Sequence, residues 1–442
     1  MSALQDASTA PSARPSRWRR FAVLCLLGGL LLAAWVIWDN WGHQAPPRTG
    51  PAVDLNDPAR IAQGAYLARA GNCAACHTAR GGVPLAGGRG IDTPFGTVYS
   101  SNLTPDDDTG LGRWSADAFW TALHLGRSPD GRLLTPAFPY NHTSVITRED
   151  SDALFAWLRQ QPATHQTTPA HTLQWPLGTQ PALAVWRSLF FRPTPFRADP
   201  QQSTEWNRGA YLVQGLGHCA ACHSPRNVLG ASGPVDDLSG GRIPGLNWYA
   251  TNLLSERESG LARTPIEDIV QLLRTGQGAG ASTSGPMGEV VQHALQHLTE
   301  ADLGAMATYL QARARQTPPD TAPAAAPPGA ARARHGREVY EAQCAQCHGA
   351  QGEGAAGLYP PLAGNRAVLL DDPTNLVRMV LHGGYGPATE GRPRPFGMPP
   401  YVLTLSDEDI ASVLTHLRSQ WGHQAREVTA LQVLQIRAGT GR

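Results

Sequence analysis

The sequence contains the pentapeptide Cys73-Ala74-Ala75-Cys76-His77, which recurs as Cys219-Ala220-Ala221-Cys222-His223 and Cys344-Ala345-Gln346-Cys347-His348. Each copy has the pattern Cys-x-x-Cys-His, in which two thiols bond covalently to a haem and the histidine ligates its iron. Thiols three positions apart lie on one face of a helical turn, and the adjacent imidazole falls beneath the macrocycle. The sequence therefore predicts three covalently bound haem c groups, with His77, His223 and His348 as iron ligands.

A single Cys-x-x-Cys pair could instead hold a structural zinc ion or form a disulfide. Three copies of the whole pentapeptide argue against both interpretations, because they contain all but one of the 7 cysteines. The composition is that of an ordinary folded chain, with 41% hydrophobic residues and a net charge of +1, which argues against nucleic acid as a partner. A length of 442 residues suits about three domains, one for each predicted haem.

An uncharged stretch, residues 21–38, follows several arginines near the N-terminus. As a helix it would reach about 27 Å, close to the thickness of the hydrocarbon core of a bilayer, so it is predicted to be a transmembrane anchor. The charge asymmetry places residues 1–20 in the cytoplasm and the rest of the chain on the periplasmic face of the cytoplasmic (inner) membrane. A cleaved signal peptide is the alternative, although the stretch is long for one and no clear cleavage motif follows.

Each haem motif lies in a repeat with the same order of signals. A glycine eight to ten residues before the first cysteine is followed by an aromatic residue and predicts a closely packed opening helix; these glycines are Gly64, Gly209 and Gly336. A Thr or Ser followed by acidic residues predicts the N-cap of a closing helix; these caps are Thr147, Thr299 and Ser406.

The repeats predict a mainly α-helical protein with three tandem domains, residues 59–161, 206–313 and 335–420. Their order of helices resembles the class I cytochrome c fold, in which the first and last helices cross and a loop between them supplies the sixth iron ligand. Segment 162–205 is apolar enough to pack across the first two domains. Segment 314–334 is predicted to be a flexible linker that lets the third domain sit apart. We expect the C-terminal tail, 421–442, to form a strand on the third domain, with a docking or membrane-surface segment as the alternative.

Methionine is the usual sixth ligand of an electron-transferring cytochrome c, and it raises the reduction potential of the iron. The chain has only 5 methionines. Met287 and Met398 lie among Gly and Pro residues, in expected loops ahead of the closing helices, and are predicted to ligate the second and third irons. Met306 and Met379 lie in apolar helical stretches and are predicted to be core residues.

The first repeat has no methionine, and Phe138 stands where Met398 stands in the third. His142 follows four residues later, and we expect it to be the sixth ligand of the first iron. An open or Phe138-covered iron is one alternative, and ligation by His124 or another histidine is a second. Because a bis-histidine iron lacks the upward pull of a methionine ligand, the first haem is predicted to have the lowest potential of the three.

The runs Ser101-Asn102-Leu103-Thr104-Pro105-Asp106, Asn207-Arg208-Gly209-Ala210-Tyr211-Leu212 and Tyr359-Pro360-Pro361-Leu362-Ala363-Gly364-Asn365 resemble those of the tri-haem cytochrome c subunits of membrane-bound dehydrogenases. The resemblance extends over about residues 58 to 430. It implies a membrane-anchored subunit that takes electrons from a catalytic dehydrogenase subunit and passes them to ubiquinone or another respiratory acceptor.

The segment around Phe138 distinguishes branches of this family. The alcohol and gluconate branch typically has Pro-Ala-Met-Pro-Tyr where this chain has Pro136-Ala137-Phe138-Pro139-Tyr140. Phe followed closely by His142 is more similar to the cytochrome parts of molybdopterin oxidoreductases that act on aldehydes or N-heterocycles. The resemblance therefore implies a molybdopterin partner with an iron-sulfur subunit. A quinoprotein (PQQ) alcohol dehydrogenase or a flavin-dependent (FAD) gluconate or sorbitol dehydrogenase is the alternative.

The sequence shows no nucleotide-binding loop, catalytic triad or substrate pocket, so no catalytic residue is assigned. Two further hypotheses remain beside the electron-transfer subunit. One is a haem peroxidase that uses an open first haem, and the other is a cytochrome subunit of a terminal oxidase.

Overall fold

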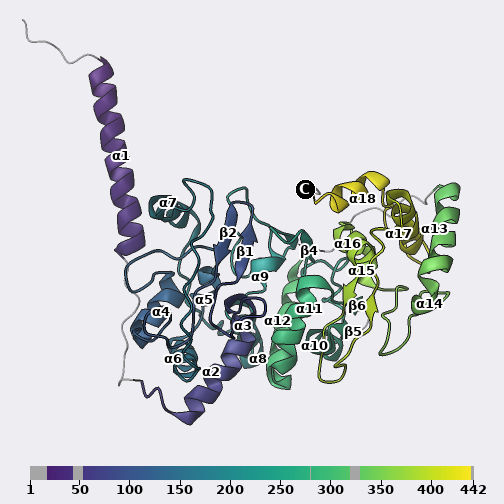
Figure 1. Ribbon diagram of the computed structural model, residues 1–442, viewed down its shortest axis with the longest axis horizontal. Helices are drawn as coiled ribbons and strands as arrows, with labels where there is room; N and C mark the ends of the chain where they lie inside the picture. Colours follow the sequence, from purple (N-terminus) through teal and green to yellow (C-terminus); the bar gives the residue numbers. More distant parts are fainter. Residues whose placement is uncertain (1–16, 43–52, 279, 319–328, 440–442) are drawn as a thin grey trace, which may run out of the picture.

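The structure, a computed structural model, describes residues 17–42, 53–278, 280–318 and 329–439. The described part of the chain is mainly helical, and its strands form 2-stranded antiparallel sheets. Figure 1 shows three groups of elements that follow one another in chain order along the body, with helix α1 (Arg17–Trp41) projecting from one end. We refer to these groups as the first, second and third units.

Each unit begins with an opening helix followed by a short helix at its Cys-x-x-Cys-His motif, and each ends with a closing helix. The elements between them differ, and the bounds are as follows. The first unit (58–159) contains α2 (Pro58–Ala70), α3 (Cys73–His77), β1 (Gly90–Thr93), β2 (Gly96–Tyr99), α4 (Ala116–Leu125), α5 (Tyr140–Thr143) and α6 (Arg148–Arg159). The second (204–316) contains α8 (Thr204–Gln214), α9 (Ala220–His223), β3 (Gly241–Ile243), β4 (Trp248–Ala250), α10 (Ile266–Thr275), β5 (Gln277–Gly278), β6 (Ala281–Ser282), α11 (Gly285–His293), η1 (Leu295–His297) and α12 (Glu300–Gln316). The third (330–419) contains α13 (Ala330–Gln343), α14 (Ala345–His348), α15 (Arg366–Leu369), α16 (Thr374–His382), β7 (Gly384–Tyr385), β8 (Gly397–Met398) and α17 (Asp407–Ser419).

In each unit the opening and closing helices cross at a glycine. A Cβ atom added to Gly64 or Gly209 would lie 1.9 Å from a carbonyl oxygen of the closing helix, and one added to Gly336 would lie 2.1 Å from such an oxygen. No side chain fits at such distances, so only glycine lets the two backbones approach so closely. The helices α2, α8 and α13 therefore pack closely against α6, α12 and α17, as the sequence predicts for these glycines.

The closing helices begin at the predicted caps. The side chains of Thr147, Thr299 and Ser406 each accept a hydrogen bond from the backbone amide three residues later, which satisfies a donor that the helix itself leaves unpaired. Behind the caps, each closing helix buries apolar side chains in the core of its unit; among them are Phe155, Met306 and Leu414. Met306 is therefore a core residue, whereas Met379 in α16 is only half-buried.

The third unit packs directly against the second, so the expectation that it sits apart is wrong. The backbone amide of Tyr249 donates to the side chain of Asn375 (2.8 Å), which returns a 2.7 Å hydrogen bond to the Tyr249 carbonyl. Arg242 pairs with Asp372 at 3.1 Å. The expectation came from the composition of segment 314–334, whereas the contacts are made by residues outside that segment. Helices α12 and α13 extend into both ends of that segment, and residues 319–328 lie outside the described residues.

The C-terminal tail forms a helix, α18 (Ala430–Arg437), and not the expected strand. Thr429 caps it in a reciprocal arrangement with Gln432, and such a local signal favours a helix over a strand. Val433 and Ile436 join the core of the third unit, and Arg437 donates to Asp407 at 2.7 Å. The tail therefore packs on the third unit, as expected, but in a different conformation.

The segment between the first two units contains α7 (Gln180–Phe190), which contacts α1. The side chain of Asn40, near the end of α1, donates to the Ala184 carbonyl (3.0 Å) and the Ser188 hydroxyl (2.9 Å). The buried guanidinium of Arg187 donates to Asn40 (3.0 Å) and lies 4.6 Å from the ring centre of Tyr140, in the first unit. Helix α1 is long and apolar enough to cross a membrane, and its base is joined to the body through these contacts.

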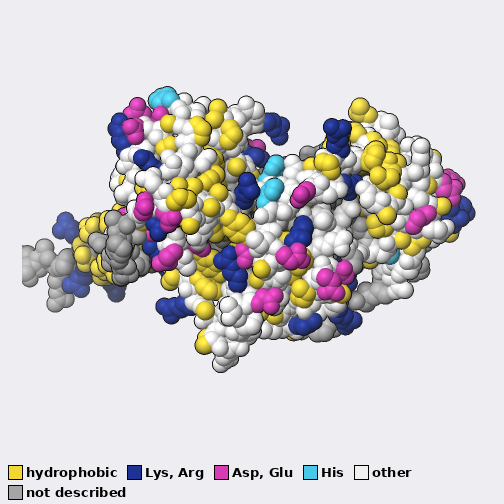
Figure 2. All heavy atoms as spheres, turned by 90° about the horizontal axis from the view of Figure 1, so that it is seen from below, with side chains coloured by type: hydrophobic (Ala, Val, Ile, Leu, Met, Phe, Trp, Pro, Cys, Tyr) yellow, Lys and Arg dark blue, Asp and Glu magenta, His cyan; other side chains and the backbone are white. Residues whose placement is uncertain are grey.

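The face of the body turned away from the far end of α1 carries charges of both signs. Figure 2 shows Arg side chains interspersed with Asp and Glu side chains on that face, without a large area of one sign. This distribution agrees with the net charge of +1.

The glycine crossings make a testable prediction about stability. Replacing Gly209 with Ala forces a methyl group against the Ala305 carbonyl and should cost about 1–3 kcal/mol by overpacking. Gly304, in the closing helix of the same pair, is the matched control, because an added Cβ would meet only Glu205 at an ordinary 3.7 Å. Thermal unfolding should show a midpoint several degrees lower for Gly209→Ala and an unchanged or higher midpoint for Gly304→Ala. Equal midpoints for the two variants would contradict this account of the crossing.

Candidate haem attachment sites

The paired cysteines lie on short helical turns after the opening helices. Cys73 and Cys76 belong to α3, whereas Cys219 and Cys344 immediately precede α9 and α14, which contain Cys222 and Cys347. None of the six forms a disulfide in the structure. Burial, assisted by the second cysteine of each pair, raises the pKa of Cys73 and Cys219 to about 12 and that of Cys344 to about 11. The protein environment alone therefore keeps the thiols of Cys73, Cys219 and Cys344 neutral.

The three motif histidines are oriented in the same way. The Nδ1 atoms of His77 and His223 lie 2.7 Å from the carbonyl oxygens of Ser101 and Thr251, and Nδ1 of His348 lies 3.0 Å from the Pro360 carbonyl. Because a carbonyl only accepts, Nδ1 carries the proton and Nε2 keeps its lone pair. Burial lowers the pKa of all three imidazoles, which favours the neutral form that binds metal.

These side chains fit covalent haem better than a protein-held metal ion. Within the described ranges, no three His, Cys, Asp or Glu side chains come together in a way that could hold a metal ion. Each motif instead offers two neighbouring thiols and one imidazole with a free Nε2, which is the donor set for two thioether bonds and one axial ligand.

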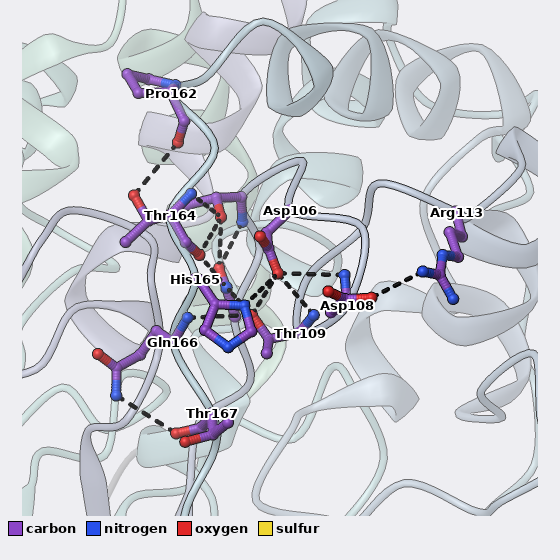
Figure 3. Close-up of polar contacts among 11 residues, drawn as sticks. Asp106, Asp108, Thr109, Arg113, Pro162, Thr164, His165, Gln166 and Thr167 are labelled. Atoms are coloured by element: carbon purple, nitrogen blue, oxygen red, sulfur yellow. Dashed lines mark hydrogen bonds and ion pairs between the residues drawn. The ribbon is translucent and has the colours of Figure 1, made fainter.

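A loop stabilised by its own polar side chains supplies the carbonyl for His77. Asn102 accepts a hydrogen bond from the Thr104 amide (2.9 Å) and donates to the Thr164 carbonyl (2.8 Å). Figure 3 shows Asp106 at the centre of this loop, where it accepts from the hydroxyl and amide of Thr109. These bonds hold the pKa of Asp106 below its usual range. The loop is thereby rigid where Ser101 orients the histidine.

The second unit contains a similar polar loop beside its motif histidine, which the sequence analysis did not predict. Asn252 follows Thr251 as Asn102 follows Ser101, and its side chain accepts from the Leu254 amide at 2.9 Å. Glu258 accepts from the Asn252 amide at 3.0 Å. A comparison of Ser101-Asn102-Leu103 with Thr251-Asn252-Leu253 as an internal repeat could have identified the carbonyls that orient His77 and His223.

The structure places neither candidate methionine in a free loop, so that part of the expectation is wrong. Met287 lies in the first turn of α11 and packs against the core of the second unit. Met398 lies in β8, pairs with Gly384 and packs against the core of the third unit. Glycine and proline allow a regular turn or a short strand here as readily as an irregular loop. Each thioether is still held against the core of its own unit.

The segments that carry Phe138 and Met398 lie beside comparable glycines in the first and third units. Gly383 and Gly126 follow α16 and α4, respectively, and each has a positive φ. A Cβ atom added to Gly383 would clash with Met398 and with the prolines that follow it. A Cβ atom added to Gly126 would clash with Tyr140. The segment that carries Phe138 therefore crosses the first unit where the segment with Met398 crosses the third, and Phe138 packs against the core of the first unit.

His142, in α5, has the same orientation pattern as the motif histidines. Its Nδ1 lies 2.8 Å from the carbonyl oxygen of Gln214, in the second unit, and its buried Nε2 has no hydrogen-bond partner among the described residues. Burial lowers its pKa to about 4, so the ring is neutral. His124, the alternative, is also buried and stacks on Trp120 with 4.4 Å between ring centres. Nδ1 of His124 is likewise buried without a hydrogen-bond partner among the described residues, and such a nitrogen is unfavourable unless something ligates it.

The first and second units are joined by a reciprocal pair of hydrogen bonds. The Tyr66 hydroxyl, in the opening helix of the first unit, donates to Asp302 in the closing helix of the second (2.6 Å). The Tyr211 hydroxyl, in the opening helix of the second unit, donates to Asp150 in the closing helix of the first (2.5 Å). Burial acts to raise the Asp302 pKa, but hydrogen bonds from Arg208 and Tyr66 outweigh it, so the pKa lies below its usual range.

This pairing brings two attachment motifs together. Burial is the main reason why the pKa of Cys222 is raised, and Cys76 of the first unit raises it further. A Cβ on Gly71 would lie 3.2 Å from Leu216 of the second unit and 3.4 Å from the Cys73 sulfur. The first two haem motifs are therefore neighbours across the interface.

The third unit meets the second through the segments that carry the methionines. The Ala388 amide, between β7 and β8, donates to Gln292 of α11 at 3.1 Å, and Gln296 donates to the Ala388 carbonyl at 3.0 Å. Met287 and Met398 belong to these two packed segments.

Comparisons with known proteins agree with these features. A cytochrome c family model matches residues 333–421. The chain is 38% identical over 439 residues to a nicotinate dehydrogenase subunit from Pseudomonas putida, covering 98% of this chain but only 36% of that longer protein. It is 39% identical to the cytochrome c subunit of alcohol dehydrogenase (quinone) of Gluconacetobacter polyoxogenes, over 86% of this chain and 85% of the relative. It is 38% identical to the gluconate 2-dehydrogenase cytochrome c subunit of Pantoea cypripedii, over 87% of this chain and 91% of the relative.

The reciprocal tyrosines provide the test of this arrangement. Tyr66→Phe leaves Asp302 with one donor fewer in a mostly buried position and should cost about 1–3 kcal/mol. The cost should appear as faster hydrogen exchange in α2 and η1, which face each other across the interface. The depressed pKa of Asp302 means that its stabilising effect is present at neutral pH and is lost as the pH falls through the folded-state pKa. The difference between wild type and Tyr66→Phe should therefore shrink in acid.

The exposed Tyr385 provides the matched control for this variant. Its side chain faces solvent on the third unit, so Tyr385→Phe should leave exchange in α2 and η1 unchanged. Equal exchange in wild type and Tyr66→Phe would show that the hydroxyl does not hold the two units together.

Proposed function

Because the chain belongs to the family of dehydrogenase-associated cytochrome c subunits, we propose that it carries three covalent haem c groups and transfers electrons from a catalytic subunit to a respiratory acceptor. The observation that carries this proposal is the threefold repetition of one site: two thiols, an imidazole oriented by a backbone carbonyl, and a glycine crossing behind them. Each covalent haem, when bound, supplies a one-electron iron couple.

The proposal assigns the same three tasks to the residues of each unit. Cys73, Cys76, Cys219, Cys222, Cys344 and Cys347 fix the haem, and His77, His223 and His348 supply one axial ligand each. The carbonyls that hold Nδ1 keep each imidazole in one tautomer and orientation, so that little rearrangement accompanies a change in charge. The buried cores behind the sites exclude water. We assign residues 59–161, 206–313 and 335–420 to three cytochrome c domains on this basis.

We propose Met287, Met398 and His142 as the remaining axial ligands. The two thioethers are held against the cores of their own units, and the buried Nε2 of His142 has no other partner among the described residues. With histidine in place of methionine, the first site has the lowest potential.

We propose a molybdopterin-containing partner with an iron-sulfur subunit, acting on an aldehyde or an N-heterocycle. Phe138 at the place of a methionine supports this branch. The alignment with the relative from nicotinate dehydrogenase, whose name specifies an N-heterocyclic substrate, extends over 98% of the chain and also supports it. Alcohol and gluconate dehydrogenase relatives align over 86% and 87%.

We further propose that α1 anchors the chain in the cytoplasmic membrane, with the three units on the periplasmic face, and that ubiquinone is the acceptor. The length and apolar character of α1 support the anchor, and the arginines at its start support the orientation. A membrane-soluble quinone is the acceptor that such a position favours.

Cofactor analysis of the complex purified through this chain from its native membrane tests the partner. We expect molybdenum, a pterin and iron-sulfur clusters, together with haem c that becomes reduced when the substrate is added. PQQ or flavin without molybdenum would contradict the choice of partner and leave the electron-transfer role intact. Haem that the substrate of the complex does not reduce would contradict the electron-transfer role itself.

Substitution of His142 tests the first site. His142→Ala should convert one low-spin haem to a high-spin signal in the electron paramagnetic resonance spectrum of the oxidised protein. His142→Met should keep that haem low-spin and raise the lowest step of a redox titration, because a thioether favours the reduced iron. The exposed His293 supplies the control, since His293→Ala should change neither measurement. An unchanged spectrum for His142→Ala would favour an iron that is open or covered by Phe138.

A further inference from the structure

Helix α7 presents an apolar face that nothing in the described structure covers. Its inner side, which includes Leu183 and Ala184, packs with Val36 of α1. Val185 and Leu189, one turn apart on the outer side, are exposed, with 57% of Leu189 accessible to solvent. Phe190 at the end of the helix is also exposed. A contiguous apolar surface on the outer side of a helix that already packs on its inner side marks an interaction site.

Two neighbouring loops continue this apolar surface. The Trp186 ring nitrogen donates to the Leu229 carbonyl at 2.9 Å, which joins α7 to the exposed residues Val228 and Leu229. Gly230, the next residue, lies beside the ring of Phe95. The Phe95 carbonyl in turn accepts from the Gln174 amide (2.9 Å), next to the exposed Trp175 and Leu177. We call this surface the α7 face; it comprises Trp175, Leu177, Val185, Leu189, Phe190, Val228 and Leu229.

The position of α1 indicates what covers the α7 face. The residues of α1 that touch α7, Val36 and Asn40, lie among Trp35, Trp38 and Trp41, and tryptophans favour the boundary between lipid and water. Figure 1 shows α7 beside the base of α1 and running across its direction. If α1 crosses a bilayer, α7 therefore lies in the plane of that bilayer at the level of the headgroups, where amphipathic helices bind.

We propose that the α7 face is seated in the interfacial layer of the bilayer that α1 crosses, so that the body has a second, fixed membrane contact. This inference rests on the proposed anchor. Continuity with α1 favours lipid over a protein partner, because a partner on this face would have to compete with the bilayer beside it. Arg187 connects α1 to the first unit, because it donates hydrogen bonds both to Asn40 and to the Leu125 carbonyl (2.6 Å). The first two haem motifs are then held at a fixed height above the membrane.

Thiol labelling of the full-length holoprotein in proteoliposomes tests the proposal. In a Cys25→Ala background, a single new cysteine replaces Leu189 or Val228 on the α7 face, and a charged maleimide that does not enter lipid reports its exposure. The control is Leu403→Cys, because Leu403 is 94% exposed on the third unit. We expect labelling at positions 189 and 228 to be at least about tenfold slower than at 403, as for interfacial positions. Haem content and absorption spectra should match those of the parent protein.

Labelling rates within about twofold of the control would overturn the proposal, because side chains in the interface exclude a charged reagent. Protection that appears only after the catalytic subunits are added would overturn it too, because a protein would then cover the face. Extraction with alkaline carbonate separates this inference from the anchor on which it rests. A chain that is extracted has no anchor, whereas a chain that stays in the membrane but labels at 189 as it does at 403 contradicts the α7 face alone.

Discussion

The contact on which the rest of the structure depends is the crossing of two backbones at a single glycine. At Gly64, Gly209 and Gly336 the opening helix lies directly on a carbonyl of the closing helix. The haem motif begins eight to ten residues after each glycine, so the crossing determines where the paired thiols and the imidazole lie relative to the core of the unit. The three crossings are similar, and each precedes a Cys-x-x-Cys-His motif, so a larger residue at any of them would displace the motif that follows.

The acidic residues of the closing helices have a second use that differs among the units. Asp150 and Asp302 follow the caps Thr147 and Thr299, and each also accepts a hydrogen bond from the tyrosine of the other unit. In the third unit the corresponding Asp409 bonds His335 of its own unit (2.7 Å). There the aromatic residue, Tyr340, follows its glycine by four positions instead of two and bonds the Gly349 carbonyl. Consequently the first two units form a reciprocal pair, and the third attaches through other surfaces.

Much of the fold within each unit could be predicted from sequence, because the sequence patterns that indicate it are local. The haem motifs, the glycine crossings and the helix caps depend on residues a few positions apart, and the helix caps and crossings lie where the sequence predicts them. The packing of the third unit on the second could not be predicted, since Asn375 and Tyr249 are distant in sequence and no pattern links them. The orientation of His142 by Gln214 was likewise inaccessible, because that carbonyl belongs to another unit. Phe138 could be recognised as a departure because the third repeat offers Met398 for comparison.

The most direct test of the account is to locate iron in the purified protein by anomalous X-ray scattering. The account predicts three iron atoms, one beside Nε2 of each of His77, His223 and His348, with the first two irons on either side of the Tyr66–Asp302 and Tyr211–Asp150 interface. Fewer than three irons, or an iron bound by the cysteine sulfurs in place of an imidazole, would contradict it.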